Sequence, residues 1–222
     1  MAVPHFYRYF LGIRPHPRHY PAFQAFAEAA GQSIDLALLH LTFCVIGQCA
    51  ERDRFMLQRV GRALNGQVLH SFPVNLSRIV MNMQGAAART SGRQDEIQDF
   101  YRRLTRLLLA WGIEPMYRKS GLHPHVTLGY RACEPGVLPI ALEWFPAELL
   151  LIESEYGLTR HNVLGRWPLL PPRQLPLPFG GFGGNPPAAC RRNSKLRGAL
   201  IDNRSPAQQE ASHDREYREC PL

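Results

Sequence analysis

The sequence predicts an α+β fold with largely antiparallel sheets. Strand-like and helix-like segments alternate along residues 6–169, in an order close to βαβαβ followed by αβββ. Two of the strand-like segments also repeat one short motif around a histidine. The mixed order favours antiparallel sheets with helices packed on them. The repeated motif indicates two halves, each with one histidine-bearing strand.

The strands are predicted from apolar, aromatic and β-branched runs. The first run is rich in aromatic residues, and the second is the most apolar run of the chain. The last two predicted strands are joined by a turn around residues 157–161. We expect strands at residues 6–13, 36–46, 74–83, 125–130, 148–156 and 163–169.

Three segments have the features of helices. Residues 21–30 begin with a proline and are rich in alanine, which is typical of a helix with proline in its first turn. Residues 53–64 place apolar residues near helical spacing and end at Asn65-Gly66. Residues 95–111 form the clearest helix, which Gly112 should end. Its expected apolar face consists of Ile97, Phe100, Leu104, Leu107, Leu108 and Trp111.

The composition changes near residue 170. Residues 1–170 have the pattern of one folded domain with two lobes, whereas residues 171–222 are rich in proline, glycine and arginine. Such a tail buries too little apolar surface to offset the entropy cost of ordering it, so we expect disorder there. Its glycine cluster lacks the lysine and the preceding strand of a phosphate-binding loop.

The charge of the chain is compatible with an anionic partner. The formal net charge is +8, and Lys119 and Lys195 are the only lysines, so nearly all the positive charge is arginine. Arginine binds phosphate through two parallel hydrogen bonds. A genomic preference for arginine codons explains the same composition equally well, and charge alone does not identify a ligand.

Several protein classes do not match the sequence. Five cysteines without a C-x-x-C spacing argue against a disulfide scaffold or a structural zinc site. No stretch approaches the roughly 20 apolar residues of a membrane span. Arginines and prolines interrupt the N-terminal segment where a signal peptide would be apolar. We therefore expect a cytoplasmic protein that binds no membrane.

The repeated motif is His-x-Thr between apolar residues. It occurs as LHLTF at residues 39–43 and as PHVTL at residues 124–128. Alternate residues of a strand share one face. His40 and Thr42 should therefore point to one side, and His125 and Thr127 likewise. Each strand would offer one imidazole and one hydroxyl to a shared cleft.

This set of groups matches the needs of cyclic phosphodiester hydrolysis. The reaction requires a base that deprotonates water and an acid that protonates the departing ribose oxygen. Imidazole, with an ordinary pKa near 6.5, can serve as either. Threonine hydroxyls can donate hydrogen bonds to the phosphate oxygens, where negative charge develops. The scheme requires no metal and no cofactor.

Structural explanations compete with this hypothesis. A lone histidine on an apolar strand is more often a hydrogen-bonded core residue than a catalyst, and threonine is a common strand former. Two copies of the motif are harder to dismiss than one, but the pattern alone leaves both interpretations open. The His123–His125 pair could suggest a metal site, yet no acidic or histidine cluster completes it.

Longer stretches around the motifs resemble the 2H phosphoesterase superfamily, and within it the bacterial RNA 2′,3′-cyclic phosphodiesterases (the 2′-5′ RNA ligase family). The resemblance spans about residues 6–170 and excludes the tail. It implies two lobes of antiparallel sheet with outer helices and approximate two-fold symmetry about a central cleft. Four stretches carry it: YFLGI at 9–13, LHLTFCVIG at 39–47, HPHVTLGY at 123–130, and LIES at 151–154 with NVLGRWPL at 162–169.

The resemblance implies a metal-independent cyclic phosphodiesterase, a hydrolase with His40 and His125 as catalytic pair and Thr42 and Thr127 as phosphate ligands. In relatives the first histidine tends to be assigned as acid and the second as base, although the symmetry allows either order. The substrate would be RNA or a nucleotide with a 2′,3′-cyclic phosphate, or with a related cyclic or 2′-5′ phosphodiester. We expect a monomer. The alternative is a non-catalytic module that binds RNA or nucleotides.

One departure from the family pattern concerns the nucleotide. Many RNA-directed members have an arginine a few residues after the second histidine, where this chain has Leu128-Gly129-Tyr130. Arg131 follows directly and is a candidate replacement, although a shift of one residue along a strand reverses the face. Tyr130 and Arg131 are therefore the candidate nucleotide contacts.

Overall fold

A computed structural model of the chain describes residues 6–90, 92–116, 122–156, 158 and 160–172. All of them lie within the first of two units into which the chain divides, residues 1–176 and 177–222. The tail predicted for residues 171–222 falls, from residue 173 onward, outside the described residues. The boundary at residue 170 therefore stays a prediction.

The described strands form one antiparallel sheet of eight strands in the order β6-β3-β4-β5-β2-β1-β7-β8. Because α-helices lie along this sheet, the predicted α+β class is confirmed. The strands are β1 (Phe6–Ile13), β2 (Leu41–Cys49), β3 (Val74–Asn82), β4 (Gly85–Thr90), β5 (His125–Gly129), β6 (Gly136–Trp144), β7 (Glu148–Tyr156) and β8 (Arg160–Pro168).

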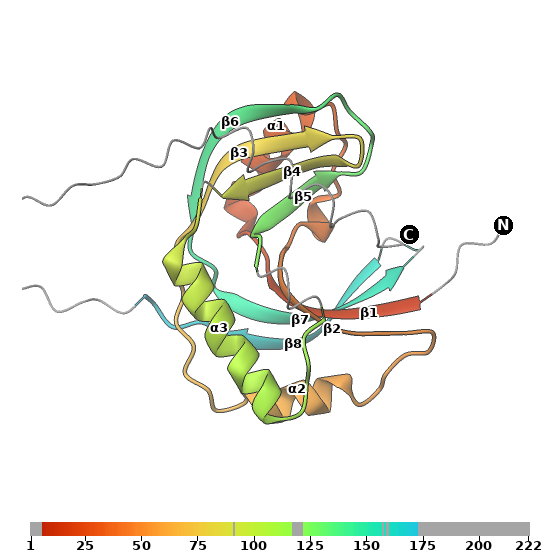
Figure 1. Cartoon of the computed structure of the whole chain (residues 1–222), viewed down its shortest axis with the longest axis vertical. Helices are drawn as coiled ribbons and strands as arrows, with labels where there is room; N and C mark the ends of the chain where they lie inside the picture. The colour runs from red at the N-terminus through yellow and green to blue at the C-terminus, as the bar shows by residue number, and fades with distance from the viewer. Residues whose placement is uncertain (1–5, 91, 117–121, 157, 159, 173–222) are drawn as a thin grey trace, which may run out of the picture. The chain divides into compact units, whose positions relative to one another are not determined.

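The sheet consists of two half-sheets that meet at its two central strands. We call β2-β1-β7-β8 lobe 1 and β5-β4-β3-β6 lobe 2, and Figure 1 shows them as separate groups of arrows. Among the described residues, only Leu41 of β2 and Val126 of β5 pair across the junction. Read outward from the junction, β2, β1, β7 and β8 correspond in order to β5, β4, β3 and β6. The expected two halves, each with one histidine motif, are present.

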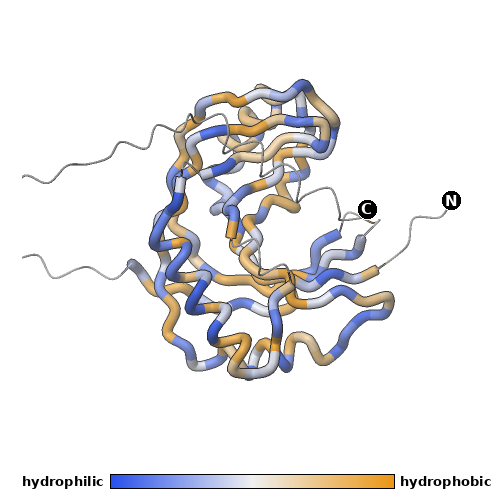
Figure 2. Tube along the Cα trace, in the orientation of Figure 1, coloured by the Kyte–Doolittle hydropathy of each residue, from blue (hydrophilic) through white to orange (hydrophobic). Residues whose placement is uncertain are grey.

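The helices divide between the lobes. Helix α1 (Tyr20–Ala29) lies beside lobe 2, and Phe23 places its ring 6.0 Å from that of Trp144 in β6. Helices α2 (Met56–Leu64) and α3 (Asp95–Ala110) lie along lobe 1. Hydrophobic and hydrophilic residues alternate along α3, as Figure 2 shows, because one face of this helix is buried against the sheet.

Most of the predicted apolar face of α3 is buried, but its end is not. Ile97, Phe100, Leu104 and Leu108 are buried as expected. Trp111 is 56% exposed, so the predicted apolar face does not extend to it. It lies one residue beyond the helix, where Gly112 adopts a φ of +69° that ends the regular backbone and turns the chain away.

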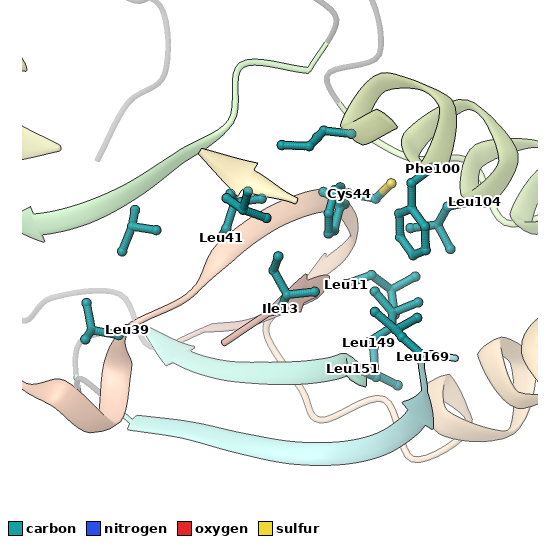
Figure 3. Close-up of a cluster of buried hydrophobic side chains, with 14 of the residues drawn as sticks. Leu11, Ile13, Leu39, Leu41, Cys44, Phe100, Leu104, Leu149, Leu151 and Leu169 are labelled. Atoms are coloured by element: carbon teal, nitrogen blue, oxygen red, sulfur yellow. The ribbon is translucent and has the colours of Figure 1, made fainter. Parts of the chain in front are cut away.

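The main hydrophobic core runs through both lobes, and one part of it lies between lobe 1 and α3. Side chains of β1, β2 and β7 converge there on the helix, as Figure 3 shows. The labelled members are Leu11, Ile13, Leu39, Leu41, Cys44, Phe100, Leu104, Leu149, Leu151 and Leu169. A smaller cluster of Phe10, Leu150 and Ile152 lies on the opposite face of lobe 1. Lobe 1 therefore has buried side chains on both of its faces.

The structure corrects two parts of the strand prediction. The run at 36–46 is not one strand: residues 36–38 form a 3₁₀ turn capped by Asp35, and β2 begins only at Leu41, so His40 directly precedes the strand. Strands β4 and β6 were missed, because β4 is built from small residues and β6 contains Pro139. Proline is tolerated in β6 because this strand lies at the edge of the sheet.

In the part of the chain that the structure describes, no helix combines the length and apolar character needed to cross a membrane.

Candidate active site

The two histidine motifs meet at the junction of the lobes. Leu41 and Val126, the residues after each histidine, pair with each other and are fully buried. Because the strands are antiparallel, this pair brings His40 to the side of Thr127 and His125 to the side of Thr42. The structure thus brings both predicted pairs together, on the sheet face opposite Leu41 and Val126.

Both imidazole rings are held in the same way. Nδ1 of His40 lies 2.7 Å from the carbonyl oxygen of Leu38, and Nδ1 of His125 lies 2.9 Å from that of His123. A carbonyl can only accept, so each Nδ1 must carry the proton and donate it. The second ring nitrogen, Nε2, is then left to accept or deliver a proton in each ring. The same bond to the residue two positions earlier occurs in both lobes.

The surroundings of His40 favour its neutral form. Burial lowers the pKa of His40 to about 4, although the hydrogen bond to Leu38 opposes the shift. The positive charges of His161, His125 and Arg14 lower it further. The ring of Phe10 lies 4.8 Å from the His40 ring and excludes water on that side. At neutral pH, His40 is therefore an uncharged imidazole.

His125 is shifted in the same direction. Burial lowers its pKa below the ordinary 6.5, and the hydrogen bond to His123 opposes this effect. The charge of Arg89, and then that of His123, lowers the pKa further. An anion between the two rings would reverse part of these shifts, because a negative charge stabilises the imidazolium form.

Each threonine of the motifs has a very small neighbour on the next strand. Thr42 pairs with Gly12 of β1, and Thr127 pairs with Ala87 of β4. Both threonines are half-buried. A Cβ atom on Gly12 would lie 2.6 Å from the carbonyl oxygen of Leu41, so the close approach of β1 to β2 requires glycine. In both lobes the small neighbour puts no long side chain next to the threonine.

Sequence reasoning missed two arginines at this site, Arg89 and Arg14. Arg89 is the register partner of His125. In lobe 1, Ile13 pairs with Leu41. Arg14 follows Ile13 and His40 precedes Leu41, so the antiparallel register brings Arg14 next to His40. The Nε atoms of both arginines are hidden from water and have no hydrogen-bond partner among the described residues. Only the register of the strands reveals their position, since neither arginine belongs to a motif.

A third histidine also lies at the site. The ring of His161, from β8, packs edge-on against those of His40 and Phe10, with centroid distances of 5.0 and 5.6 Å. Burial lowers its pKa to about 4, Arg14 adds to this shift, and Asp35 opposes it. His161 is therefore uncharged at neutral pH and packs against one side of the His40 ring. No pattern in the sequence points to this residue, because it lies outside both motifs.

The predicted nucleotide contacts occupy the segment after β5. Tyr130 is 81% exposed, and Arg131 is exposed as well. The buried amide of Gln32 holds this segment, because it donates to the Arg131 carbonyl at 2.9 Å and accepts from the Arg131 N–H at 3.0 Å. A Cβ atom on Gly129 would collide with Gln32, so glycine is required there. The backbone is fixed, and both side chains point to solvent.

Two shallow depressions lie away from the histidines. One, of about 500 Å³, is lined by Tyr101, Thr105 and neighbouring arginines of α3, and the other, of about 470 Å³, lies between α2 and β8. Their described lining residues include neither His40 nor His125. Among the described residues, no group of three or more histidine, cysteine and acidic side chains is arranged to hold a metal ion.

Comparisons of sequence find no relatives. No protein-family model matches the chain. A search of curated protein sequences finds no match either.

Comparisons of structure do find relatives. A protein described as a phosphoesterase superposes with a TM-score of 0.60 and 18% identity, over 73% of this chain and 98% of that one. LigT of E. coli in complex with 3′-AMP gives 0.61 and 19% identity, over 74% and 98%. TT0787 of Thermus thermophilus gives 0.58 and 19%, over 75% and 100%. The chain therefore has the fold of these proteins, which is the fold that the 2H phosphoesterase resemblance predicted.

Proposed function

We propose that this chain is a metal-independent phosphodiesterase that hydrolyses a 2′,3′-cyclic phosphate on RNA or a nucleotide. The observation that supports it most is the matched orientation of His40 and His125. Two imidazoles, one directly before β2 and one at the start of β5, each donate Nδ1–H to a backbone carbonyl and keep Nε2 for the reaction. A purely structural histidine has no need for such a duplicate.

In the proposed reaction, one imidazole removes a proton from water as the water oxygen attacks phosphorus. The bond from phosphorus to one ribose oxygen breaks, and the other histidine, as imidazolium, gives its Nε2 proton to that oxygen. The products are a phosphate monoester and a free hydroxyl, and the two histidines have exchanged protonation states. Proton exchange with water restores the starting state.

The threonines would stabilise the charge that develops on phosphorus. Thr42 lies beside His125, and Thr127 lies beside His40. Each threonine also has a small neighbour on the next strand. Hydroxyl donors aimed at phosphate oxygens lower the transition-state energy more than the ground-state energy when charge grows there. Removal of such a donor costs about 10²–10³ in kcat.

The surroundings of the two rings favour His40 as the base and His125 as the acid. This is the reverse of the order that the family resemblance implies. His40 is covered by Phe10 and His161 and has its pKa lowered to about 4, so it holds no proton at neutral pH. His125 lies beside Thr42, and no ring contact of this kind covers it among the described residues.

The nucleotide itself would lie over the segment after β5. Tyr130 offers an exposed ring on which a base can stack, a contact worth about 1–3 kcal/mol per base. Arg131 is the second proposed contact, through its exposed side chain. The two hydrogen bonds between the Gln32 amide and the Arg131 backbone would keep Tyr130 and Arg131 in place. E. coli LigT has been solved in complex with 3′-AMP, ATP and NADP+, which makes a nucleotide a reasonable ligand for the shared fold.

The test is hydrolysis of 2′,3′-cyclic mononucleotides in the presence of EDTA. We expect the wild-type chain to turn over, and His40→Ala and His125→Ala each to lose at least about 10²–10⁴ in kcat, the usual contribution of one general acid or base. The position of the product phosphate will show which ribose oxygen leaves. Thermal unfolding of each variant serves as the control for folding.

The alternative, a non-catalytic binding module, makes the opposite prediction. It expects no hydrolysis of cyclic nucleotides or of RNA with cyclic ends, together with nucleotide binding that both alanine variants retain. Activity that EDTA abolishes would also remove the proposal, because the mechanism uses no metal.

A further inference from the structure

A row of basic side chains crosses lobe 2 outward from His125. Arg89 of β4 is the register partner of His125, and Arg78 of β3 is the register partner of Arg89. Register partners in an antiparallel sheet lie side by side on one face, with Cα atoms about 4.5–5.5 Å apart. The three residues therefore share a face with Thr127. Their chain neighbours, which are buried on the other face, are Ile79, Ala88 and Val126.

The protein does not neutralise this row by itself. Among the described residues, Arg78 and Arg89 form no ion pair and no side-chain hydrogen bond, and Nε of Arg89 is hidden from water. Like charges directly opposite each other destabilise a sheet. The adjacent row of register partners carries no charge; it consists of Thr127, Ala87, Val80 and Val137. A bound anion would remove the repulsion.

Lobe 1 differs at the corresponding place. There Arg166 of β8 forms an ion pair with Glu148 of β7, with Nη1 and Oε1 2.5 Å apart. Arg14, the counterpart of Arg89, lies within the electrostatic reach of both of these residues. The arginines of lobe 1 therefore have a carboxylate among them, whereas Arg78 and Arg89 of lobe 2 form no ion pair with any described carboxylate. An anionic ligand gains more from lobe 2.

We propose that Arg89 and Arg78 form a phosphate subsite for the phosphodiester next to the reacting cyclic phosphate. The site would then take an RNA end in preference to a mononucleotide. This inference rests on the proposed function, which puts the reacting phosphate between His40 and His125. In an RNA with a 2′,3′-cyclic end, the next phosphate is on the 5′ oxygen of the same nucleotide. Guanidinium groups bind such oxygens through two parallel hydrogen bonds.

The test compares two unreactive ligands, so that it does not depend on turnover. Adenosine 3′,5′-bisphosphate carries the second phosphate, and adenosine 3′-monophosphate lacks it. By titration calorimetry, we expect the wild-type chain to bind the bisphosphate about tenfold more tightly, a difference of about 1.4 kcal/mol. In the double variant Arg78→Met/Arg89→Met this ratio should fall to about one, the value expected without a second contact.

The single variant Arg78→Met is the main readout should the double variant fail to fold, because Arg78 is exposed and its loss leaves the core intact. It should lower the ratio and leave the affinity for the monophosphate unchanged. Arg106→Met is the matched control. It removes the same charge from an exposed position on α3 and should keep the wild-type ratio.

Three outcomes would overturn the subsite: a wild-type ratio near one, a ratio that persists in the double variant, or an equal fall of the ratio in Arg106→Met. Hydrolysis of 2′,3′-cyclic AMP, measured in parallel, separates this inference from the proposed function. An arginine-dependent ratio without hydrolysis would remove the function and keep the subsite. Hydrolysis together with an affinity ratio that is the same in the wild type and the double variant would keep the proposed function and remove the subsite.

Discussion

Lobe 1 and lobe 2 place the same reactive groups at the junction but surround them differently. Each lobe supplies a histidine oriented by a backbone carbonyl, a threonine beside a small residue, and an arginine near the histidine. In lobe 1 the histidine is covered by the rings of Phe10 and His161. In lobe 2 the same face carries two arginines without an ion pair among the described residues, and it ends at the exposed Tyr130.

This difference indicates that the two lobes share the reactive groups but differ in how they would contact a substrate. The repeated groups are those that the proposed hydrolysis would need on both sides of phosphorus. The groups that differ are the rings of Phe10 and His161 in lobe 1 and the arginines and Tyr130 in lobe 2. A substrate whose two sides differ chemically would contact one set on each side. The residue five positions after each histidine illustrates this: Val45 packs against the Phe10 cluster in lobe 1, whereas Tyr130 faces solvent in lobe 2.

The symmetric part of the comparison predicts equal losses in the two lobes. Thr42→Val and Thr127→Val should each reduce kcat for a 2′,3′-cyclic nucleotide by about 10²–10³, the usual cost of one lost donor to a developing negative charge. Valine keeps the shape and the strand preference, so the fold should be retained. If one variant loses activity and the other remains within a few-fold of wild type, the two threonines do not share one role.

The asymmetric burial of the histidines predicts the pH dependence. A base must be deprotonated, so kcat/KM should rise as the pH passes the pKa of His40, about 4 in the free protein. An acid must be protonated, so kcat/KM should fall as the pH passes the pKa of His125, which lies below 6.5. A pH–rate profile measures both limbs. A rising limb centred at pH 6.5 or above would contradict the assignment of His40 as base.

Tyr130 tests the difference in nucleotide contact. Tyr130→Ala should raise KM by about tenfold, within the 1–3 kcal/mol of a lost base–ring stack, and leave kcat nearly unchanged. Tyr130→Phe keeps the ring and should behave as wild type. Steady-state kinetics on a cyclic nucleotide and on a cyclic ribose phosphate without a base make the comparison. An equal effect of Tyr130→Ala on both substrates would mean that Tyr130 does not contact the base.

We expect the smallest effects from substitutions at two buried hydrogen-bonded contacts, one in each lobe. Gln32 clasps the backbone of Arg131 in lobe 2. In lobe 1 the Tyr9 hydroxyl donates to Glu153 at 3.0 Å and accepts from the Asp53 N–H at 2.7 Å.

Gln32→Ala and Tyr9→Phe should each lower the free energy of unfolding by about 1–3 kcal/mol, because buried polar partners lose their hydrogen bonds. Urea denaturation measures both losses. Only Gln32→Ala should also raise KM, since only Gln32 holds the segment that carries Tyr130. A KM increase of the same size in Tyr9→Phe would show that the effect comes from general loosening.

The local pattern of the sequence determined the elements whose cause is local. The strand at residues 6–13 and the strand at 148–156 have the predicted bounds, and α3 begins at the predicted residue. Aromatic and branched runs, helical spacing and a terminal glycine act within a few residues, so they can be read without the fold. The two His-x-Thr motifs are of the same kind, because alternation along a strand decides which side chains share a face.

The tertiary structure alone decided the rest of the site. Strand β4 became a strand because β3 and β5 pair with it on both sides, although its own residues are small and have little preference for extended backbone. Arg89 reaches His125, and His161 reaches His40, across sequence distances that no local pattern spans. Register between distant strands sets these contacts, and register follows from the packing of the whole sheet. The sequence thus determined which groups can react, and the pairing of the strands decided which charges and rings surround them.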